Sequence, residues 1–429
     1  MKTGRNDPCY CGSCKKYKKC CLNKQDNFKM NFSKDYFNLK GKKAEEIVHA
    51  LAQKTFFIDW CFLNPKWPDG KELCDLLVIF DEVAIIWQIK DLKLNKFGKY
   101  NKSEVEKNLK QLSGARRKLF DLKADICLEN SRRKKEKYNS AKIKEVYLIS
   151  VLLGEGEEVS SFIEEDKNGI RHIFTKEFTQ IVLNELDTIN DFVGYLRIKE
   201  KFLKKNKGLM VIGGEQEFLA HYLINGRNFD EFENFDNVII PDGLWEHFQN
   251  KAEYLAKKKA DGISYGWDSM VNRAYECSPE YEKVARELAR PNRFQRRYLS
   301  KAFFEAYKKA HEASKDKKYN CLRRMVPGEG TTYCFIFQDD VEPRNSRRTH
   351  LGIFCEVARG TYQQNTKVLG IATEMKSQST CSYDLCFLDM PEWTEENQMR
   401  MEKNKNELKV FINPTMSYCG EDEYPKIDK

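Results

Sequence analysis

The sequence contains no apolar run long enough to cross a membrane and no apolar leader, since Met1 leads directly into a cysteine-rich segment. It also lacks internal repeats and extended low-complexity stretches. The 15 cysteines form no repeated framework beyond the first 21 residues, which fits a reducing compartment. We therefore expect a cytoplasmic protein with no membrane partner.

Several enzyme signatures are absent as well. The sequence has no phosphate-binding P-loop and no dinucleotide fingerprint, and its glycine pairs, such as Gly213 and Gly214, are those of ordinary turns. The 6 histidines are scattered without the spacing of metal ligands or of a nucleophile's base. A histidine-based hydrolase therefore has no support.

What is present is a long, well-mixed globular composition. The chain has 429 residues, 41% of them hydrophobic and 12% aromatic, which is enough for two or three domains with cores of their own. Charged residues make up 32% of the chain and leave a net charge of +9. This modest basic excess is compatible with a polyanionic partner without requiring one.

The N-terminal segment carries the sharpest motif. Cys9, Cys11, Cys20 and Cys21 have the spacing C-x-C-x8-C-C around a short basic loop that contains glycine. Two close cysteine pairs can hold one structural Zn²⁺ with four thiolates, and the metal then supplies folding free energy that so short a segment lacks. A disulfide or a set of free thiols is the alternative.

These residues resemble the SEC-C motif, a zinc motif named after the C-terminus of the SecA ATPase. The sequence departs from that family at Cys14, where glycine is usual, so a fifth thiol lies beside the four expected ligands. The resemblance implies an accessory module that docks a protein partner. It does not specify an activity.

Hydrophobic patterns predict the order α-β-β-β-α-β after a polar linker. A helix is expected from residue 41, with Ala44, Ile47, Val48 and Leu51 on one face. Strands are expected at residues 55–63, 73–80, 83–89 and 146–153, and an amphipathic helix at residues 102–124. Together they predict an α+β (mixed α/β) fold in which helices flank a mixed sheet.

The later part of the chain has a different character. We predict a further strand at residues 172–178, helices at 181–204, 215–225 and 243–313, and strand-like runs around Phe335, Ile353, Val368 and Leu385. The last 40 residues are polar and are expected to be peripheral. The predicted domains are a knuckle (1–24), a linker (25–40), a first domain (41–204) and a C-terminal α+β domain of unknown role (209–429).

The hairpin at residues 71–91 is the second strong signal. Asp75 lies in an otherwise apolar strand, where a carboxylate is costly unless it is paired, hydrogen-bonded or bound to a metal. On the next strand Gln88 and Lys90 are two residues apart and so share a face. An antiparallel turn near Asp81 places Asp75 roughly opposite Gln88. An acid, an amide and an ammonium group should therefore converge.

This arrangement resembles the PD-(D/E)xK nuclease superfamily over residues 41–160, and within it the Mrr-like and NERD-like restriction endonucleases. The resemblance implies a restriction-endonuclease-like core with Asp75 on one hairpin strand and Gln88 and Lys90 as the (E/Q)-x-K motif on the other. The family's helix acid corresponds by spacing to Glu45, with Glu46 as the alternative. Gln88 stands where glutamate is commoner, which leaves one negative charge fewer for a metal.

The resemblance implies catalysis by Mg²⁺ or Mn²⁺. Asp75 and Glu45, with Gln88 and a backbone carbonyl near Ile89, would hold the metal, while Lys90 would orient water or neutralise charge on the phosphate. The following helix is expected to contact the nucleic-acid backbone. Its candidate residues are Lys110, Gln111, Arg116 and Arg117, with Lys118 nearby.

Each feature also has a purely structural interpretation. Lys90 could be an edge residue that reaches solvent, and Asp75 could pair with Lys71. The basic helix and residues 132–135 fit a solvated surface better than a specific DNA contact. Only the joint order of these elements favours a nuclease.

We therefore expect a metal-dependent endonuclease, a hydrolase that acts on phosphodiester bonds. The resemblance implies DNA as its substrate and antiviral defence against foreign DNA as its setting. The alternative is a non-catalytic adaptor that keeps the nuclease fold and binds nucleic acid or protein. A zinc-dependent chaperone accessory like the SecA tail is a third possibility, but it leaves the pairing of Asp75 with Lys90 unexplained.

Overall fold

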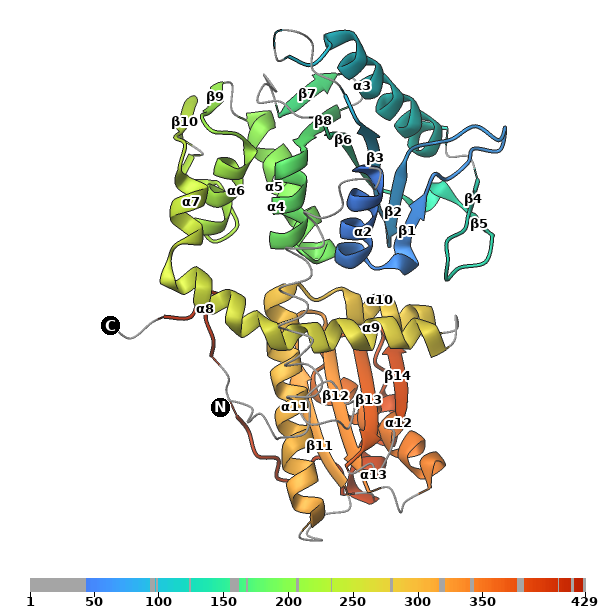
Figure 1. Ribbon diagram of the computed structural model, residues 1–429. Coiled ribbons are helices and arrows are strands. Elements are labelled where there is room, and N and C mark those ends of the chain that lie inside the picture. The colour runs from blue at the N-terminus through green and yellow to red at the C-terminus, as the bar shows by residue number, and fades with distance from the viewer. Residues whose placement is uncertain are drawn as a thin grey trace. The chain divides into compact units, whose positions relative to one another are not determined.

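The computed structural model in Figure 1 describes most of the chain from Ala44 to Lys426. The residues left out within that span are 93–96, 98, 123–124, 155–161, 167–168, 206–207, 233, 278–280, 316–320, 340–342, 376–381, 408 and 418–419. The described chain divides into two compact units, one up to Leu255 and one from Ala256. Both combine helices with sheets, which confirms the mixed α/β class. The predicted knuckle and linker lie outside the described residues.

A six-stranded sheet forms the centre of the first unit, in the order β1-β2-β3-β6-β8-β7. Neighbouring strands are antiparallel except that β6 runs parallel to both β3 and β8. The predicted order α-β-β-β-α-β is therefore present. The strands are β1 (Cys61–Leu63), β2 (Leu76–Phe80), β3 (Val83–Lys90), β6 (Glu145–Leu152), β7 (Ile163–Asp166) and β8 (Gly169–Thr175).

The strand predicted at residues 55–63 is wrong over most of its length. Helix α2 (Ala44–Phe56) continues through Phe56, a 3-10 turn follows at Ile58–Trp60, and only Cys61–Leu63 is strand. Thr55 donates its hydroxyl to the carbonyl of Leu183, and the ring of Phe56 packs edge-on against Phe192. These tertiary contacts favour the helix over the β-propensity of an aromatic-rich segment.

Both faces of the sheet are buried, so alternate residues of each strand enter different cores. Leu77 and Ile79 of β2 and Ile86 of β3 face helix α3 (Lys102–Arg116), which packs through Leu109 and Leu112. On the other face Trp87 stacks with Phe192 and contacts Phe56. Asp75, Gln88 and Lys90 have the parity of the α3 face, and they extend that apolar stripe to its polar end.

The first unit continues well past the boundary predicted near residue 204. Helix α5 (Ile189–Lys205) packs on α6 (Glu215–Ile224), where the buried ammonium of Lys199 pairs with Glu215 and Tyr195 donates to the same carboxylate over 3.0 Å. A parallel pair, β9 (Gly208–Val211) and β10 (Asn237–Ile240), follows. The unit also contains α4 (Lys176–Glu185), α7 (Leu244–Gln249), a π-helical turn (Arg117–Asp121) and the small hairpin of β4 (Ile126–Leu128) and β5 (Glu136–Tyr138).

The second unit has a four-stranded sheet in the order β11-β12-β13-β14, with only β12 and β13 parallel. One face carries aromatic contacts of Trp267 and Phe303 with Phe335, and the other packs against α12 through Leu351. The strands are Cys321–Pro327, Thr331–Gln338, Lys367–Glu374 and Tyr383–Asp389. The helices are α9 (Tyr265–Cys277), α10 (Glu282–Ala289), α11 (Arg293–Lys315), α12 (Arg344–Thr361) and α13 (Glu395–Glu407), and α8 (Ala252–Ala260) contains the division between the units.

Two predictions for this unit are wrong. Ile353 belongs to helix α12, because Leu351, Phe354, Cys355 and Ala358 recur at helical spacing and are buried. The last 40 residues are also not merely peripheral, since Met401 of α13 is buried in the core under α12.

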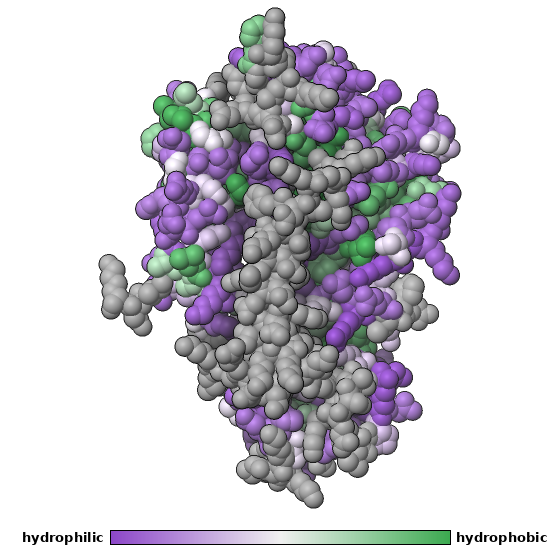
Figure 2. Space-filling view, viewed as in Figure 1, coloured by the Kyte–Doolittle hydropathy of each residue, from purple (hydrophilic) through white to green (hydrophobic). Residues whose placement is uncertain are grey.

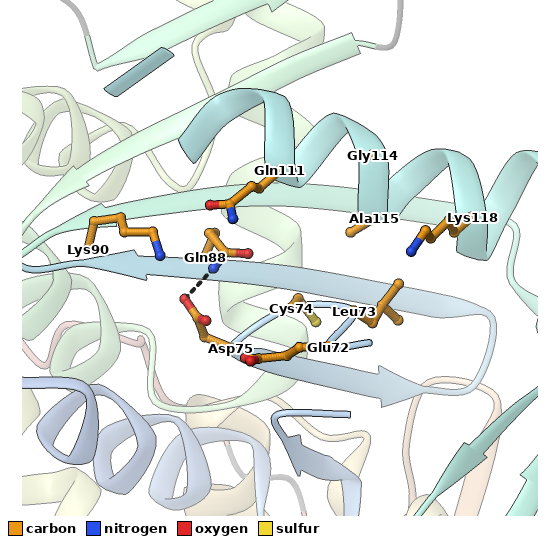
Figure 3. A pocket seen from close by; sticks show the side chains of 10 residues that line it. All are labelled: Glu72, Leu73, Cys74, Asp75, Gln88, Lys90, Gln111, Gly114, Ala115 and Lys118. Carbon is orange, nitrogen blue, oxygen red and sulfur yellow. Dashed lines mark hydrogen bonds between the residues drawn. The ribbon is translucent and has the colours of Figure 1, made fainter. Parts of the chain in front are cut away.

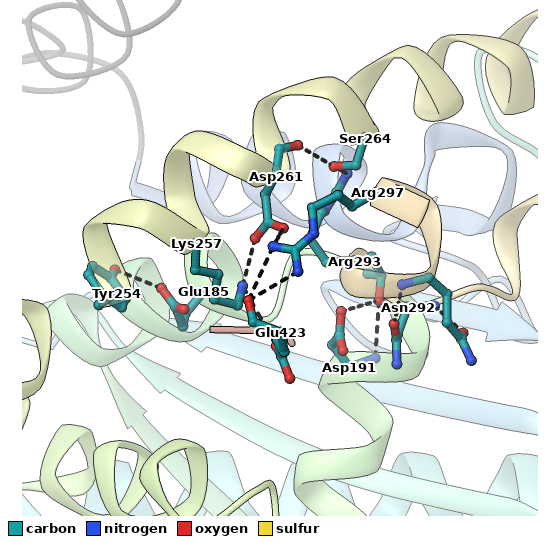
Figure 4. A network of polar contacts seen from close by, with 12 residues as sticks. Glu185, Asp191, Tyr254, Lys257, Asp261, Ser264, Asn292, Arg293, Arg297 and Glu423 are labelled. Carbon is teal, nitrogen blue, oxygen red and sulfur yellow. Dashed lines mark hydrogen bonds and ion pairs between the residues drawn. The ribbon is translucent and has the colours of Figure 1, made fainter. Parts of the chain in front are cut away.

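A buried ionic network holds residues 421–423 (Figure 4). The fully buried guanidinium of Arg297 donates to Asp261 over 3.1 Å, to the carbonyl of Asp422 over 2.8 Å and to that of Glu423 over 3.1 Å. Lys257 donates to the other oxygen of Asp261 over 2.7 Å. Because each buried charge has a partner, the network satisfies groups that would otherwise be costly.

The described surface in Figure 2 is mainly hydrophilic, with separated apolar areas. Within the described ranges, every helix is too short or too polar to cross a bilayer.

Candidate active site

Strand pairing brings the predicted acid and amide together. The hairpin of β2 and β3 pairs Leu76 with Trp87, so the preceding residue, Asp75, lies opposite Gln88. The turn at Asp81 has a left-handed backbone (φ 54°) and closes the hairpin with the predicted register. Gln88 and Asp75 are 5% and 8% exposed. Two polar side chains this deeply buried require partners.

Asp75 has those partners. Its Oδ2 accepts from the Gln88 amide nitrogen over 2.7 Å and from the backbone N–H of Ile89. The backbone group of Ile89 that reaches Asp75 is thus its amide, and the role of a carbonyl near Ile89 as a metal ligand stays a prediction. Lys71 pairs with Asp69, so it is not the partner that makes the burial of the Asp75 carboxyl possible. Figure 3 shows the Gln88 oxygen turned away from Asp75.

A second carboxyl group lies against Asp75. Burial raises the pKa of Asp75, the Ile89 amide and the Lys90 ammonium oppose the rise, and the hydrogen-bonded carboxyl of Glu72 adds to it. With its amide oriented to donate, Asn64 bonds Glu72 over 3.1 Å. Within the described chain Glu72 has no basic partner within salt-bridge distance. Two adjacent carboxyls, neither of which forms an ion pair with a basic side chain in the described chain, favour a shared proton or a metal.

These groups line one pocket of about 290 Å³ (Figure 3). Its residues come from the segment before β2, from β3, from α3 and from the π-helical turn that follows α3. They are Glu72, Leu73, Cys74, Asp75, Gln88, Lys90, Gln111, Gly114, Ala115 and Lys118. The structure therefore gathers Asp75, Gln88, Lys90 and Gln111, which sequence reasoning had selected as candidates.

Other candidates lie elsewhere. Lys110 and Arg117 are exposed on other sides of the helical segment, and Arg116 pairs with Asp121 over 3.0 Å. None of the three lines the pocket. Glu45 belongs to α2, but its side chain lies outside the described part of the structure, whereas Glu46 is exposed.

The basic run at residues 132–135 is only partly a solvated surface. Arg132 pairs with the buried Asp59 over 3.3 Å, and Arg133 pairs with Glu136 over 2.7 Å. Lys134 and Lys135 are exposed. Arg133 also donates to the carbonyl of Asp59 over 3.2 Å, so the two arginines tie this loop to the segment before β1.

Sequence reasoning missed Glu72. It named Lys118 only as a neighbour of the helix candidates, although helical spacing singles Lys118 out, because Gln111, Gly114, Ala115 and Lys118 follow the pattern i, i+3, i+4, i+7 and form one stripe. Glu72 precedes the strand in an irregular segment. No periodicity could have assigned its direction.

The chemistry of the pocket fits a hard divalent cation. Glu72 and Asp75 offer carboxylate oxygens and Gln88 an amide oxygen, all of them ligand types that Mg²⁺ accepts while it keeps several waters. The described chain contains no group of three or more histidine, cysteine or acidic side chains placed to bind a metal, here or at another site. A cation here would therefore rest on two carboxylates and on water or substrate oxygens.

One comparison with known proteins gives a match. Residues 5–23 match the SEC-C motif. The matched segment contains all four cysteines expected to bind zinc, and the SEC-C motif itself lies outside the described residues. No curated protein and no solved structure matches the chain.

Proposed function

We propose that the first unit is a metal-dependent nuclease domain that hydrolyses phosphodiester bonds, with DNA as the substrate we favour. The observation that carries the proposal is the pocket in which Asp75 is hydrogen-bonded to Gln88 while Lys90 lies on the same strand face. The α-β-β-β-α-β order around it supports the resemblance to PD-(D/E)xK enzymes. Foreign DNA is the setting that this resemblance suggests.

In this proposal the acidic residues bind the metal and the basic residue acts on the phosphate. Glu72 and Asp75, with the Gln88 oxygen, would hold Mg²⁺ or Mn²⁺, which supplies Lewis-acid polarisation of a phosphate oxygen and a more acidic water. Gln88 and the Ile89 amide fix the Asp75 carboxylate, so little reorganisation is needed at the reacting phosphate. The Lys90 ammonium has no carboxylate partner in an ion pair within the described chain. It is available to neutralise charge on the phosphate.

The direct test is degradation of plasmid and single-stranded DNA with Mg²⁺, Mn²⁺ or EDTA. Asp75→Ala and Lys90→Ala should each reduce cleavage by about 10²-fold or more. Gln88→Ala should reduce it less, because a neutral amide attracts a cation more weakly than a carboxylate does. Lys71→Ala, a charge change in the same hairpin outside the pocket, is the matched control for Lys90→Ala.

Equal cleavage by Asp75→Ala and wild type would show that the hairpin is only structural. Metal binding without cleavage of any DNA or RNA would favour the adaptor that retains a nuclease fold. Circular dichroism of each variant separates loss of chemistry from loss of folding.

A further inference from the structure

The helix side of the pocket is built differently from the hairpin side. Figure 3 shows the two acids, Glu72 and Asp75, on the hairpin side, with Lys90 near one end of the pocket and Lys118 near the other. Gln111 lies between them on α3. Gln111 and Lys118 thus lie on the helix side of the pocket, opposite its two acids, and we call this side the helix wall.

Lys118, on the helix side of the pocket, is a basic group without an ion-pair partner in the described chain. Its ammonium lies 5.4 Å from the centre of the Trp67 ring, and within the described chain it has no carboxylate partner. The neighbouring Arg116, by contrast, is paired with Asp121 and also lies over the Phe120 ring. A ring face orients an ammonium group without cancelling its charge. Lys118 is therefore oriented and still able to bind an anion.

Gly114 has open space in place of a side chain on the helix side of the pocket. It lies inside α3 with ordinary helical backbone, where glycine lowers helix stability relative to alanine. A Cβ added there would have nothing within 4 Å, so the missing side chain leaves space beside the pocket. Packing against a neighbour therefore does not explain this glycine. The open space adjoins the pocket that Gly114 lines.

We infer that Gln111, Gly114 and Lys118 form a phosphate subsite for a second, non-scissile phosphate of a nucleic-acid strand, with Lys118 as its cation and Gly114 as the residue that sets its width. The inference rests on the proposed function. Gln111 and Lys118 are seven residues apart, about 10 Å along a helix, which is longer than a single phosphate group. The helix wall therefore suits an extended strand better than an isolated phosphate.

Binding should be measured apart from cleavage, by fluorescence anisotropy of end-labelled single-stranded and duplex DNA in EDTA. Lys118→Ala should weaken binding at least fivefold and reduce the slope of log affinity against log salt by about one. Lys110→Ala removes the same charge from an exposed position on the same helix, away from the pocket, and should change affinity less than twofold. In cleavage assays Lys118→Ala should raise KM and largely preserve kcat.

Gly114 gives a second, steric test. Gly114→Leu should abolish binding because its side chain enters the open space, while Gly114→Ala should bind within about threefold of wild type. Thermal melting should show both variants folded, with Gly114→Ala at least as stable as wild type. If Gly114→Leu folds and binds as wild type does, the subsite is wrong.

The outcomes separate the two proposals. Cleavage by wild type together with equal effects of Lys118→Ala and Lys110→Ala overturns the subsite and leaves the nuclease. Binding that depends on Lys118 without cleavage supports the subsite and overturns hydrolysis. A wild-type protein that neither binds nor cleaves DNA or RNA overturns both.

Discussion

Gln88 donates a hydrogen bond from its amide nitrogen to Asp75 over 2.7 Å, so the residue opposite this acid is a hydrogen-bond donor to it. Glutamate at this position would offer only acceptors when ionised. Gln88 therefore gives the buried Asp75 carboxyl a hydrogen-bond donor in the absence of metal, and it does so with the atom that a glutamate lacks.

Gln88→Glu should make the stability of the domain depend on metal. Without metal, two buried carboxylates would face each other, and we expect a loss of about 1–3 kcal/mol. Mg²⁺ should restore most of it and should bind more tightly than in wild type. Thermal melting in EDTA and in Mg²⁺ measures this, with Gln88→Leu as the variant that removes the donor without adding charge. An equal melting temperature for Gln88→Glu in both buffers would contradict it.

Glu72→Gln should weaken Mn²⁺ binding about tenfold, because one of the two carboxylates of the proposed site is lost. Isothermal titration calorimetry measures the affinity without any substrate. Asp69→Asn removes an equivalent charge from the same hairpin loop outside the pocket and is the matched control. Equal affinities for wild type and Glu72→Gln would exclude Glu72 as a ligand.

The purified protein should contain about one zinc per chain, because four thiolates complete a tetrahedral structural site. The double change Cys20→Ser and Cys21→Ser should remove the zinc and impair docking or solubility before it affects cleavage. Cys14→Ser, which alters the extra thiol, should retain the metal. Elemental analysis distinguishes these results, and a wild-type protein without zinc would refute the assignment.

Stability should fall as the pH drops from about 6.5 to 4, partly through His172. Burial, with help from the Lys199 ammonium, lowers the pKa of His172 to about 4 in the folded state. Because the unfolded chain binds the proton first, the free energy of unfolding falls by about 2 kcal/mol between pH 7.5 and pH 5. His172→Gln should reduce this dependence in urea denaturation. An unchanged dependence in that variant would assign it to other groups.

Arg297→Met should destabilise the second unit by about 3–5 kcal/mol, since it leaves buried acceptors without their donor. Lys426→Met changes an exposed lysine in the same unit and should stay within about 0.5 kcal/mol of wild type. Differential scanning calorimetry reports both changes. Equal transition temperatures for the two variants would show that the network contributes little.

Alternation and register were sufficient to predict much of the site. Because Asp75 interrupts an apolar run of the sequence and Gln88 precedes Lys90 by two residues, their common face followed from the period of a strand. The helix covering that face followed from its apolar spacing, and Gln111 with it. The roles of these residues in catalysis remain predictions.

What failed depended on contacts that local patterns do not contain. The aromatic segment after residue 55 reads as strand, but Phe56 stays helical because it packs on Phe192. Ile353 reads as strand when its neighbours are ignored, although the burial of Leu351 and Phe354 requires a helix. Glu72 enters the pocket through an irregular segment that no period describes.

The bonds from Arg297 to the carbonyls of Asp422 and Glu423 span 125 and 126 residues. During synthesis, α11 leaves the ribosome long before these carbonyls exist. Until they arrive, the Arg297 guanidinium has only part of its final set of acceptors, and closing the unit around it would bury donors without partners. The second unit is therefore expected to complete its folding after residue 423 has emerged, whereas the first unit can fold while the second is still being made.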